Sequence, residues 1–359
     1  MSEQKGRSKI RLRLSPQAEK YARRDAPREA RRMAARGALP LPPLDLATVL
    51  FALIHDPDAE VKSIARDSLE GLPDSILDPV LSGPAHPALL SHFATAFTDN
   101  EARIEKIGLN PATDDATIAR LATLPFKKIV DIVANNQERL MRAPEIVEAL
   151  GTNPLTGRSV IERILTFLGV PVSTDADPEL SDPESISDSD AEAALRAVLG
   201  DELGDFARSF VEESDESLDA TTEGSLYSIL QNLSVFQKIK LARLGNKEAR
   251  GLLVRDRNKI VSLAAINSPR ITENEVVSFA QSRNLSDDVL RVIARNRQWT
   301  RSYQVKLALA TNPKCAQPVA IKFVNYLQER DLKTIMKSKD VHAAIATHAR
   351  RILTRKGKV

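Results

Sequence analysis

The amino-acid sequence predicts an all-α protein: an α-solenoid of stacked helix pairs in two blocks, joined by an acidic, disordered linker. Three observations lead to this prediction. Apolar residues recur at helical spacing in short segments that turn signals separate. One multi-helix block occurs twice, and a stretch between the two copies is rich in Asp, Ser, Pro and Glu. Self-similarity at a fixed offset is typical of repeat architectures.

The duplication is clearest at Ala149–Leu168 and Ala308–Leu327, which share seven of twenty residues at an offset of 159. It extends over residues 107–168 and 264–327. Asparagines at offsets of 157, 160 and 159 mark it: Asn110, Asn136 and Asn153 correspond to Asn267, Asn296 and Asn312. Asparagine suits a helix end because it tolerates a left-handed backbone and can bond nearby backbone groups. Two roles stay open for these residues: turn residues, or an exposed row that forms a binding ladder.

Charge divides the chain into four predicted domains. Residues 1–36 form a basic, partly helical arm of net charge +8, and residues 37–170 form the first repeat block, of net charge −7. Residues 171–223 form the acidic linker of net charge −15, in which one short helix can form, and residues 224–359 form the basic second block of net charge +17. Such asymmetry indicates segments that have different partners, or that partner each other.

The first helix pair follows the basic arm. Pro27 interrupts the arm and Gly37 is typical of a helix end, so we expect two short helices or one kinked helix there. Residues 46–54 and 61–69 then show the apolar spacing of two helices, separated by the turn HDPDAE. This unit resembles a HEAT repeat in its Asp-Pro-Asp turn and its second helix. The resemblance implies HEAT-like helix pairs.

The linker leaves two interpretations open. Residues 170–193 contain no Lys or Arg and too few apolar side chains to offset the entropy lost on ordering, so we expect disorder. The linker is either a solvated spacer or an autoinhibitory lid on the basic second block. Four serines among the acidic residues could add charge to such a lid through phosphorylation: Ser181, Ser185, Ser187 and Ser189.

Capping residues mark several predicted helix starts. Thr272 and Glu275 form a capping box, and Ser286 precedes two aspartates. Within the duplication, Thr156 is a predicted cap in the first copy. Cys315 occupies its place in the second copy, where a thiol caps poorly. Because a helix start can lower the pKa of a thiol, Cys315 is either a degenerate cap or a reactive group.

The second half contains the segments KIKLARLGNKEAR, LLVRDRNKIV, NSPRIT, NRQW and TNPK, and the first half contains RMAARGALPLPP. In these segments the chain resembles an uncharacterised family of bacterial helical-repeat proteins. The resemblance covers most of the chain except the linker. It implies a bacterial origin and an all-α fold, and it implies no activity.

No motif for catalysis or cofactor binding occurs in the sequence. It lacks the glycine-rich phosphate loops, the HExxH, CxxC and EF-hand patterns, and the GxSxG elbow. His342 and His348 lie six residues apart and do not share a helical face. We therefore predict a non-enzymatic protein with no catalytic residue, no cofactor and no metal.

A basic and aromatic stretch is the candidate partner-binding surface. Its residues are Arg291, Arg295, Arg297, Trp299, Arg301, Tyr303 and Lys306. Arg, Trp and Tyr dominate protein–protein hot spots, and cations interleaved with aromatic rings also bind nucleic acids. Whether Trp299, the single tryptophan, packs in the core or lies at the surface stays open at this point.

The sequence thus predicts a helical-repeat scaffold or adaptor that binds a protein partner. The alternative is a nucleic-acid-binding protein that uses the basic second block and the basic arm. The first residues lack the apolar core of a signal peptide, and no stretch of 18 apolar residues occurs, so we expect a cytoplasmic protein without a membrane span.

Overall fold

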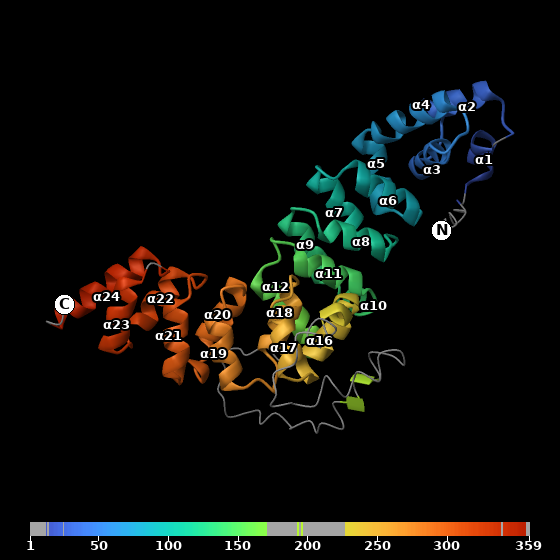
Figure 1. The fold of residues 1–359 in the computed structure, drawn as a ribbon. Helices are drawn as coiled ribbons and strands as arrows, with labels where there is room; N and C mark the ends of the chain where they lie inside the picture. The colour runs from blue at the N-terminus through green and yellow to red at the C-terminus, as the bar shows by residue number, and fades with distance from the viewer. Residues whose placement is uncertain are drawn as a thin grey trace. The chain divides into compact units, whose positions relative to one another are not determined.

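The computed structural model describes residues 12, 14–23, 25–170, 192–193, 195–196, 227–338 and 340–356. These residues form helices and turns without a strand, and the helices pack in adjacent pairs, which confirms the predicted solenoid class (Figure 1). The chain has two compact units, Met1–Leu155 and Thr156–Val359. Nearly all of the predicted linker lies outside the described residues, so its disorder and its role as a lid stay predictions.

The helices of the first unit alternate between two rows. They are α1 (Pro16–Ala22), α2 (Arg28–Ala35), α3 (Pro43–Leu53), α4 (Ala59–Glu70), α5 (Asp74–Ser82), α6 (Pro87–Ala96), α7 (Glu101–Leu109), α8 (Asp115–Ala122), α9 (Lys127–Ala134), α10 (Gln137–Arg142) and α11 (Pro144–Thr152). One row runs through α1, α3, α5, α7 and α9, each packed on the next. In the other row α2 packs on α4, α6 on α8, and α8 on α11. Most of these helices therefore pack on the next but one along the chain, as a solenoid requires, while α8 passes over α9 and the short α10 to pack on α11.

The first helix pair forms as its apolar spacing predicts. The spaced apolar residues of α3 are buried: Leu46, Val49, Leu50 and Leu53. In α4, Val61, Ala65 and Leu69 form the buried stripe. Asp58, in the predicted turn, is the N-cap of α4 and accepts hydrogen bonds from the backbone N–H groups of the first turn.

The described part of the basic arm forms two helices, α1 and α2, with Pro27 at the start of α2. Three of its arginines pair with acidic residues of the turn after α3 and of the first turn of α4. Arg31 pairs with Asp56, and Arg28 and Arg32 both pair with Glu60. The largely buried Arg31–Asp56 pair ties the arm to the first unit, and all three pairs reduce the charge that the arm can offer to a nucleic acid.

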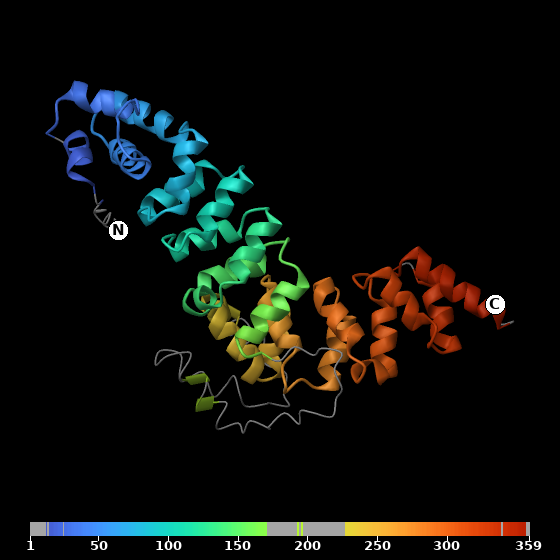
Figure 2. The ribbon, with the colours of Figure 1, turned by 180° about the vertical axis from the view of Figure 1, so that it is seen from behind.

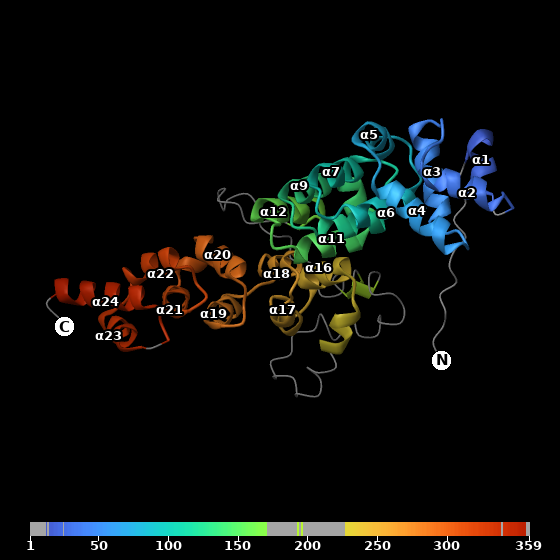
Figure 3. The same ribbon diagram turned by 90° about the horizontal axis from the view of Figure 1, so that it is seen from above.

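The second unit repeats the two-row plan (Figures 2 and 3). Its described helices include α12 (Arg158–Phe167), α16 (Val235–Leu244), α17 (Lys247–Leu253), α18 (Lys259–Ile266), α19 (Glu273–Gln281), α20 (Asp287–Arg295), the 3₁₀ helix η2 (Trp299–Arg301), α21 (Tyr303–Thr311), α22 (Gln317–Val324), α23 (Glu329–Lys337) and α24 (Ala343–Arg355). Figure 3 shows α20 and α22 in one row and α19, α21 and α23 in the other. Packing of α16 on α18, α18 on α20, and α22 on α24 continues the first row, and α19 packs on α21 in the second.

A buried ion pair ties α17 to α19 in the second unit. Arg250 is fully buried, and its Nε and Nη2 atoms each donate to a carboxylate oxygen of Glu275 at 2.9 Å. Glu275 also accepts from the backbone N–H of Thr272 at 2.9 Å, which completes the predicted capping box of α19. One carboxylate therefore both caps a helix and neutralises a buried guanidinium.

Three asparagines make the same contact between parallel helices. Asn110, Asn153 and Asn312 are the C-caps of α7, α11 and α21, and each is 3% exposed. Each side-chain Nδ2 donates to two carbonyl oxygens of the preceding helix end in the same row: one in the last turn of α5, α8 or α19, and one at or just beyond its C-cap. These distances lie between 2.6 and 3.0 Å. We call this contact the asparagine clasp.

The clasp uses nearly all of the carboxamide. While Nδ2 donates twice, Oδ1 accepts from the backbone N–H two residues later, at 2.9 Å in all three cases. The Nδ2 group therefore supplies donors to carbonyls that a helix end leaves without partners. The prediction of an exposed row of binding asparagines is wrong for these three residues, because their side chains are buried and hydrogen-bonded within the fold.

The remaining asparagines of the duplication differ. Asn267 is buried but bonds only within its own helix, to the Leu263 carbonyl at 2.8 Å. The next residue makes the contact between helices instead: the Ser268 hydroxyl donates to the Arg243 carbonyl at the end of α16, at 3.0 Å. Asn136 and Asn296 accept from the backbone N–H three residues on, which makes them local turn residues.

Of the predicted caps, Thr156 and Cys315 do not cap a helix in the structure. Ser286 caps α20 as expected. Thr156 does not cap α12, which begins after Gly157, and the buried Thr156 hydroxyl has no hydrogen bond among the described residues. Cys315 likewise precedes the N-cap of α22, Ala316. Both side chains point into the core because the turn after the asparagine clasp buries this position.

We predict that Asn110→Ala lowers the free energy of unfolding of the first unit by about 2 kcal/mol, because the carbonyls of Leu81 in α5 and of its C-cap Gly83 lose their donor. The matched control is Asn135→Ala. Asn135 is the C-cap of α9, but it is exposed and its side chain makes no hydrogen bond to the described residues. Urea unfolding and hydrogen exchange of the α5 region measure both variants. Equal losses would show that the clasp contributes no stability.

Arg250→Met is predicted to cost about 3–5 kcal/mol of stability, because Glu275 stays buried without its cation. The double variant Arg250→Met/Glu275→Gln removes the charge and keeps an acceptor for the Thr272 N–H. It should therefore recover a large part of the loss in a thermal unfolding experiment. A double variant as unstable as the single one would contradict this account.

Candidate functional site

The seven residues of the predicted partner-binding surface lie on consecutive elements of the second unit. Arg291 and Arg295 lie on α20, Arg297, Trp299 and Arg301 lie on η2 and the turn before it, and Tyr303 and Lys306 lie on α21. The structure thus places them at and beside the connection from one row to the other, where α20 ends and α21 begins.

Three of these arginines are exposed and carry uncompensated charge. Arg295, Arg297 and Arg301 make no ion pair with any residue that the structure describes. Arg291 differs, because it pairs with Asp287 one turn earlier on α20, at 3.3 Å. An exposed pair of this kind contributes little to stability, but it removes Arg291 from the free cations.

Tyr303 joins this connection to the next one along the stack. Its hydroxyl donates to the Asp331 carboxylate on α23 and accepts from the backbone N–H of Gln328 at 3.0 Å. Burial, together with the Asp331 hydrogen bond, raises the pKa of Tyr303 above its usual value. The hydroxyl of Tyr303 therefore serves the fold, and Asp331 is occupied by it.

Lys306 adds an aromatic ring that the sequence analysis missed. Its ammonium lies 5.7 Å from the ring centre of Tyr326, which belongs to the connection from α22 to α23 and is 62% exposed. Twenty residues separate the two, and no sequence pattern indicates the contact. Only the packing of α21 beside α22 brings them together.

Trp299 is half-buried in η2, so it is neither a core residue nor a freely exposed one. Its backbone N–H donates a hydrogen bond to Oδ1 of Asn296 at 3.2 Å. The exposed cations and the two rings together form a surface that we call the basic edge. It comprises Arg295, Arg297, Trp299, Arg301, Lys306 and Tyr326.

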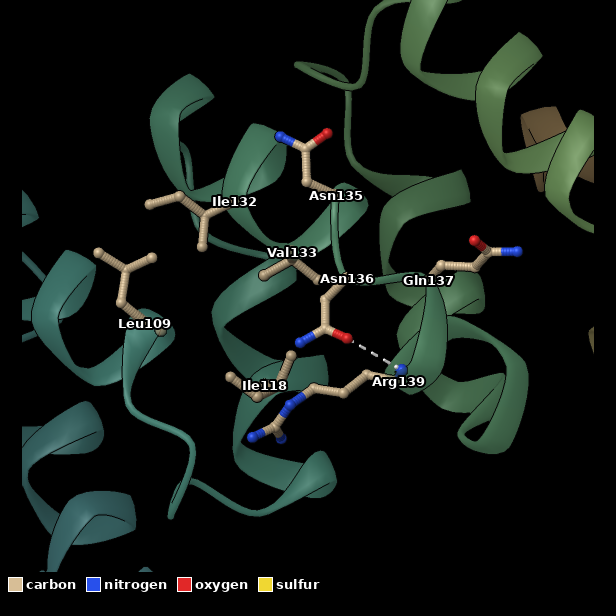
Figure 4. A pocket seen from close by; sticks show the side chains of 9 residues that line it. Leu109, Ile118, Ile132, Val133, Asn135, Asn136, Gln137 and Arg139 are labelled. Carbon is tan, nitrogen blue, oxygen red and sulfur yellow. Dashed lines mark hydrogen bonds between the residues drawn. The ribbon is translucent and has the colours of Figure 1, made fainter. Parts of the chain in front are cut away.

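The first unit carries a second, chemically different surface: a groove of about 320 Å³ between α7, α8 and α9 (Figure 4). Its apolar wall consists of Ile118, Ile132, Val133 and Leu109, of which Leu109 is 61% exposed. Beside this wall, Asn136 accepts from the Arg139 backbone N–H at 3.1 Å, so the polar end of the groove is held in place. The groove can seat an apolar side chain.

The Arg139 guanidinium at this groove is committed to the fold. It donates to the Thr113 carbonyl at 2.6 Å and to the Pro111 carbonyl at 3.1 Å, and it pairs with Asp115 at 2.8 Å. Asp115 also pairs with Arg142. The groove therefore offers apolar contact rather than free charge, in contrast to the basic edge.

Cys315 is a buried thiol that lies before the N-cap of α22. It is 3% exposed, and burial raises its pKa to about 11, which corrects the sequence-based possibility of a lowered value.

Among the described residues, no three His, Cys, Asp or Glu side chains gather as they would around a metal ion. None of the described helices is long and apolar enough to cross a membrane.

Comparison of the chain with protein-family models, with curated proteins and with solved structures finds no match. The architecture of paired helices is therefore established from the chain itself, and no family is identified.

We predict that Cys315 reacts with a thiol reagent at pH 8 about 100-fold more slowly in the folded chain than in the urea-unfolded chain, because the raised pKa leaves little thiolate. Absorbance of the released thiolate, followed over time, measures both rates. Similar rates for the folded and unfolded chains would contradict the burial of this thiol.

Proposed function

We propose that the chain is a non-enzymatic helical-repeat adaptor of the bacterial cytoplasm, and that its basic edge docks a partner protein. The observation that carries the proposal is the set of exposed arginines with no ion pair among the described residues, next to the exposed ring of Tyr326. Arginine and aromatic side chains contribute most of the binding energy in many protein interfaces.

An adaptor needs at least two surfaces of different chemistry. The basic edge of the second unit and the apolar groove of the first unit meet this need, since one attracts anionic groups and the other accepts apolar side chains. Each surface lies on a stacked framework of helices, and such frameworks commonly hold an extended binding surface in a fixed shape. The proposal assigns catalysis to neither surface.

Nucleic-acid binding through the same edge is the alternative, because free arginines beside an exposed ring can also contact phosphates and bases. The pairing of Arg28, Arg31 and Arg32 with acidic residues favours the protein interpretation, since it withdraws these cations of the arm from such a role.

Site-specific photo-crosslinking in the native cell tests the proposal. A photoreactive residue placed at Gln298 or Gln304, both exposed at the basic edge, is expected to give covalent adducts with a protein. The same residue at Thr347, exposed on α24, is the control and should give few adducts. Adding Arg297→Glu and Arg301→Glu should reduce the edge adducts about tenfold, because the electrostatic contact reverses sign.

Three results would overturn this function. Adducts that nuclease treatment removes would indicate a nucleic-acid partner. Equal adducts at the edge and at Thr347 would indicate non-specific contact. The absence of any adduct at either edge position would show that no partner docks there.

A further inference from the structure

The basic edge has a chemistry that selects among anionic partners. Resting on the proposed function, we propose that the segment docked there is acidic and extended, with carboxylates paired to Arg297 and Arg301 and an apolar side chain against Tyr326. A planar guanidinium forms two parallel hydrogen bonds to one carboxylate, which gives such pairs both strength and direction. Both arginines are exposed and unpaired within the described chain, so neither has to break an internal ion pair first.

The acidic residues next to the edge do not compete for these arginines. Asp331 accepts the Tyr303 hydroxyl, and Glu329 pairs with Lys333 at 2.9 Å. Asp287 pairs with Arg291 on α20. The edge therefore presents a net positive surface on which the nearby carboxylates are already occupied.

Neutral side chains at the edge favour a peptide over a phosphodiester. The carboxamides of Gln298, Gln304 and Gln328 are exposed and make no hydrogen bond to any described residue. A carboxamide offers both a donor and an acceptor, as the peptide backbone does. A phosphodiester backbone offers acceptors only, so the acceptor half of each carboxamide would find no partner along it.

The aromatic residues point to the same occupant. Binding of single-stranded nucleic acid uses several rings on which successive bases stack. Here Trp299 is half-buried, the Tyr303 hydroxyl is held by Asp331, and the Lys306 ammonium lies over the ring of Tyr326. One exposed ring suits a single apolar side chain of a peptide better than a run of bases.

Two contacts make this surface broad enough for an extended segment. Tyr303 binds the Gln328 backbone N–H, and Lys306 lies over Tyr326, so the connections α20–α21 and α22–α23 lie side by side. A segment that crosses from one connection to the other would meet the arginines first and Tyr326 next.

Fluorescence anisotropy with the full-length chain tests the inference. The probes are a 12-residue peptide of alternating Glu and Gly with one central Leu, the same peptide with Lys in place of Glu, and a 12-nucleotide oligothymidine. We expect the acidic peptide to bind and the lysine peptide not to bind. Arg297→Glu/Arg301→Glu should raise the Kd for the acidic peptide about tenfold, and Tyr326→Ala should raise it about threefold.

The matched control is Arg350→Glu/Arg351→Glu on α24. These arginines are exposed and lack an ion pair among the described residues, so the variant makes the same charge change on a helix that contributes no residue to the basic edge. Its Kd should stay within about twofold of the unmodified chain. Circular dichroism checks that all variants are folded.

Tighter binding of oligothymidine than of the acidic peptide, or equal effects of the edge and α24 variants, would overturn the inference. So would a failure of the acidic peptide to bind. If edge-dependent protein adducts still form in the cell while the acidic peptide fails to bind, the adaptor function stands and only the acidic specificity is lost. If no adducts form, the adaptor function itself fails.

Discussion

The hydrogen bonds from an asparagine carboxamide to the end of a neighbouring helix are the constraint on which the rest of this structure depends. Short helices leave many carbonyls without partners, because the last four of each helix have none within it. In a stack, the ends of parallel helices lie buried against the next pair, where water cannot serve them. Asn110, Asn153 and Asn312 supply the missing donors from the adjacent helix of the same row. Each clasp therefore fixes both the spacing and the direction of two neighbouring helices.

The variation at Ser268 shows which part of this contact is required. A hydroxyl reaches one carbonyl of α16, and the Arg270 guanidinium reaches the next one, Leu244, at 2.9 Å. Two side chains thus replace the two donors of one carboxamide. What the stack needs at this position is a pair of donors directed at a helix end, and more than one residue type can provide it.

A framework held by its own buried polar contacts leaves its connections free to carry different chemistry. In the first unit, Asp115 near the groove pairs with both Arg139 and Arg142, so the groove offers apolar contact. In the second unit, the connection after α20 carries arginines that have no ion pair among the described residues. The two surfaces differ because the charged side chains near the groove are paired with one another, whereas the arginines of the basic edge have no ion pair among the described residues.

The sequence by itself determined the helical class, the paired spacing of α3 and α4, and the capping box of α19, because each follows from local periodicity and local hydrogen bonds. Only the tertiary structure decided the role of the asparagines, since their partners lie about 30 residues earlier in the chain. It also decided the burial of Cys315 and the contact of Lys306 with Tyr326. These depend on which helices pack together, a property that the local pattern of side chains does not encode.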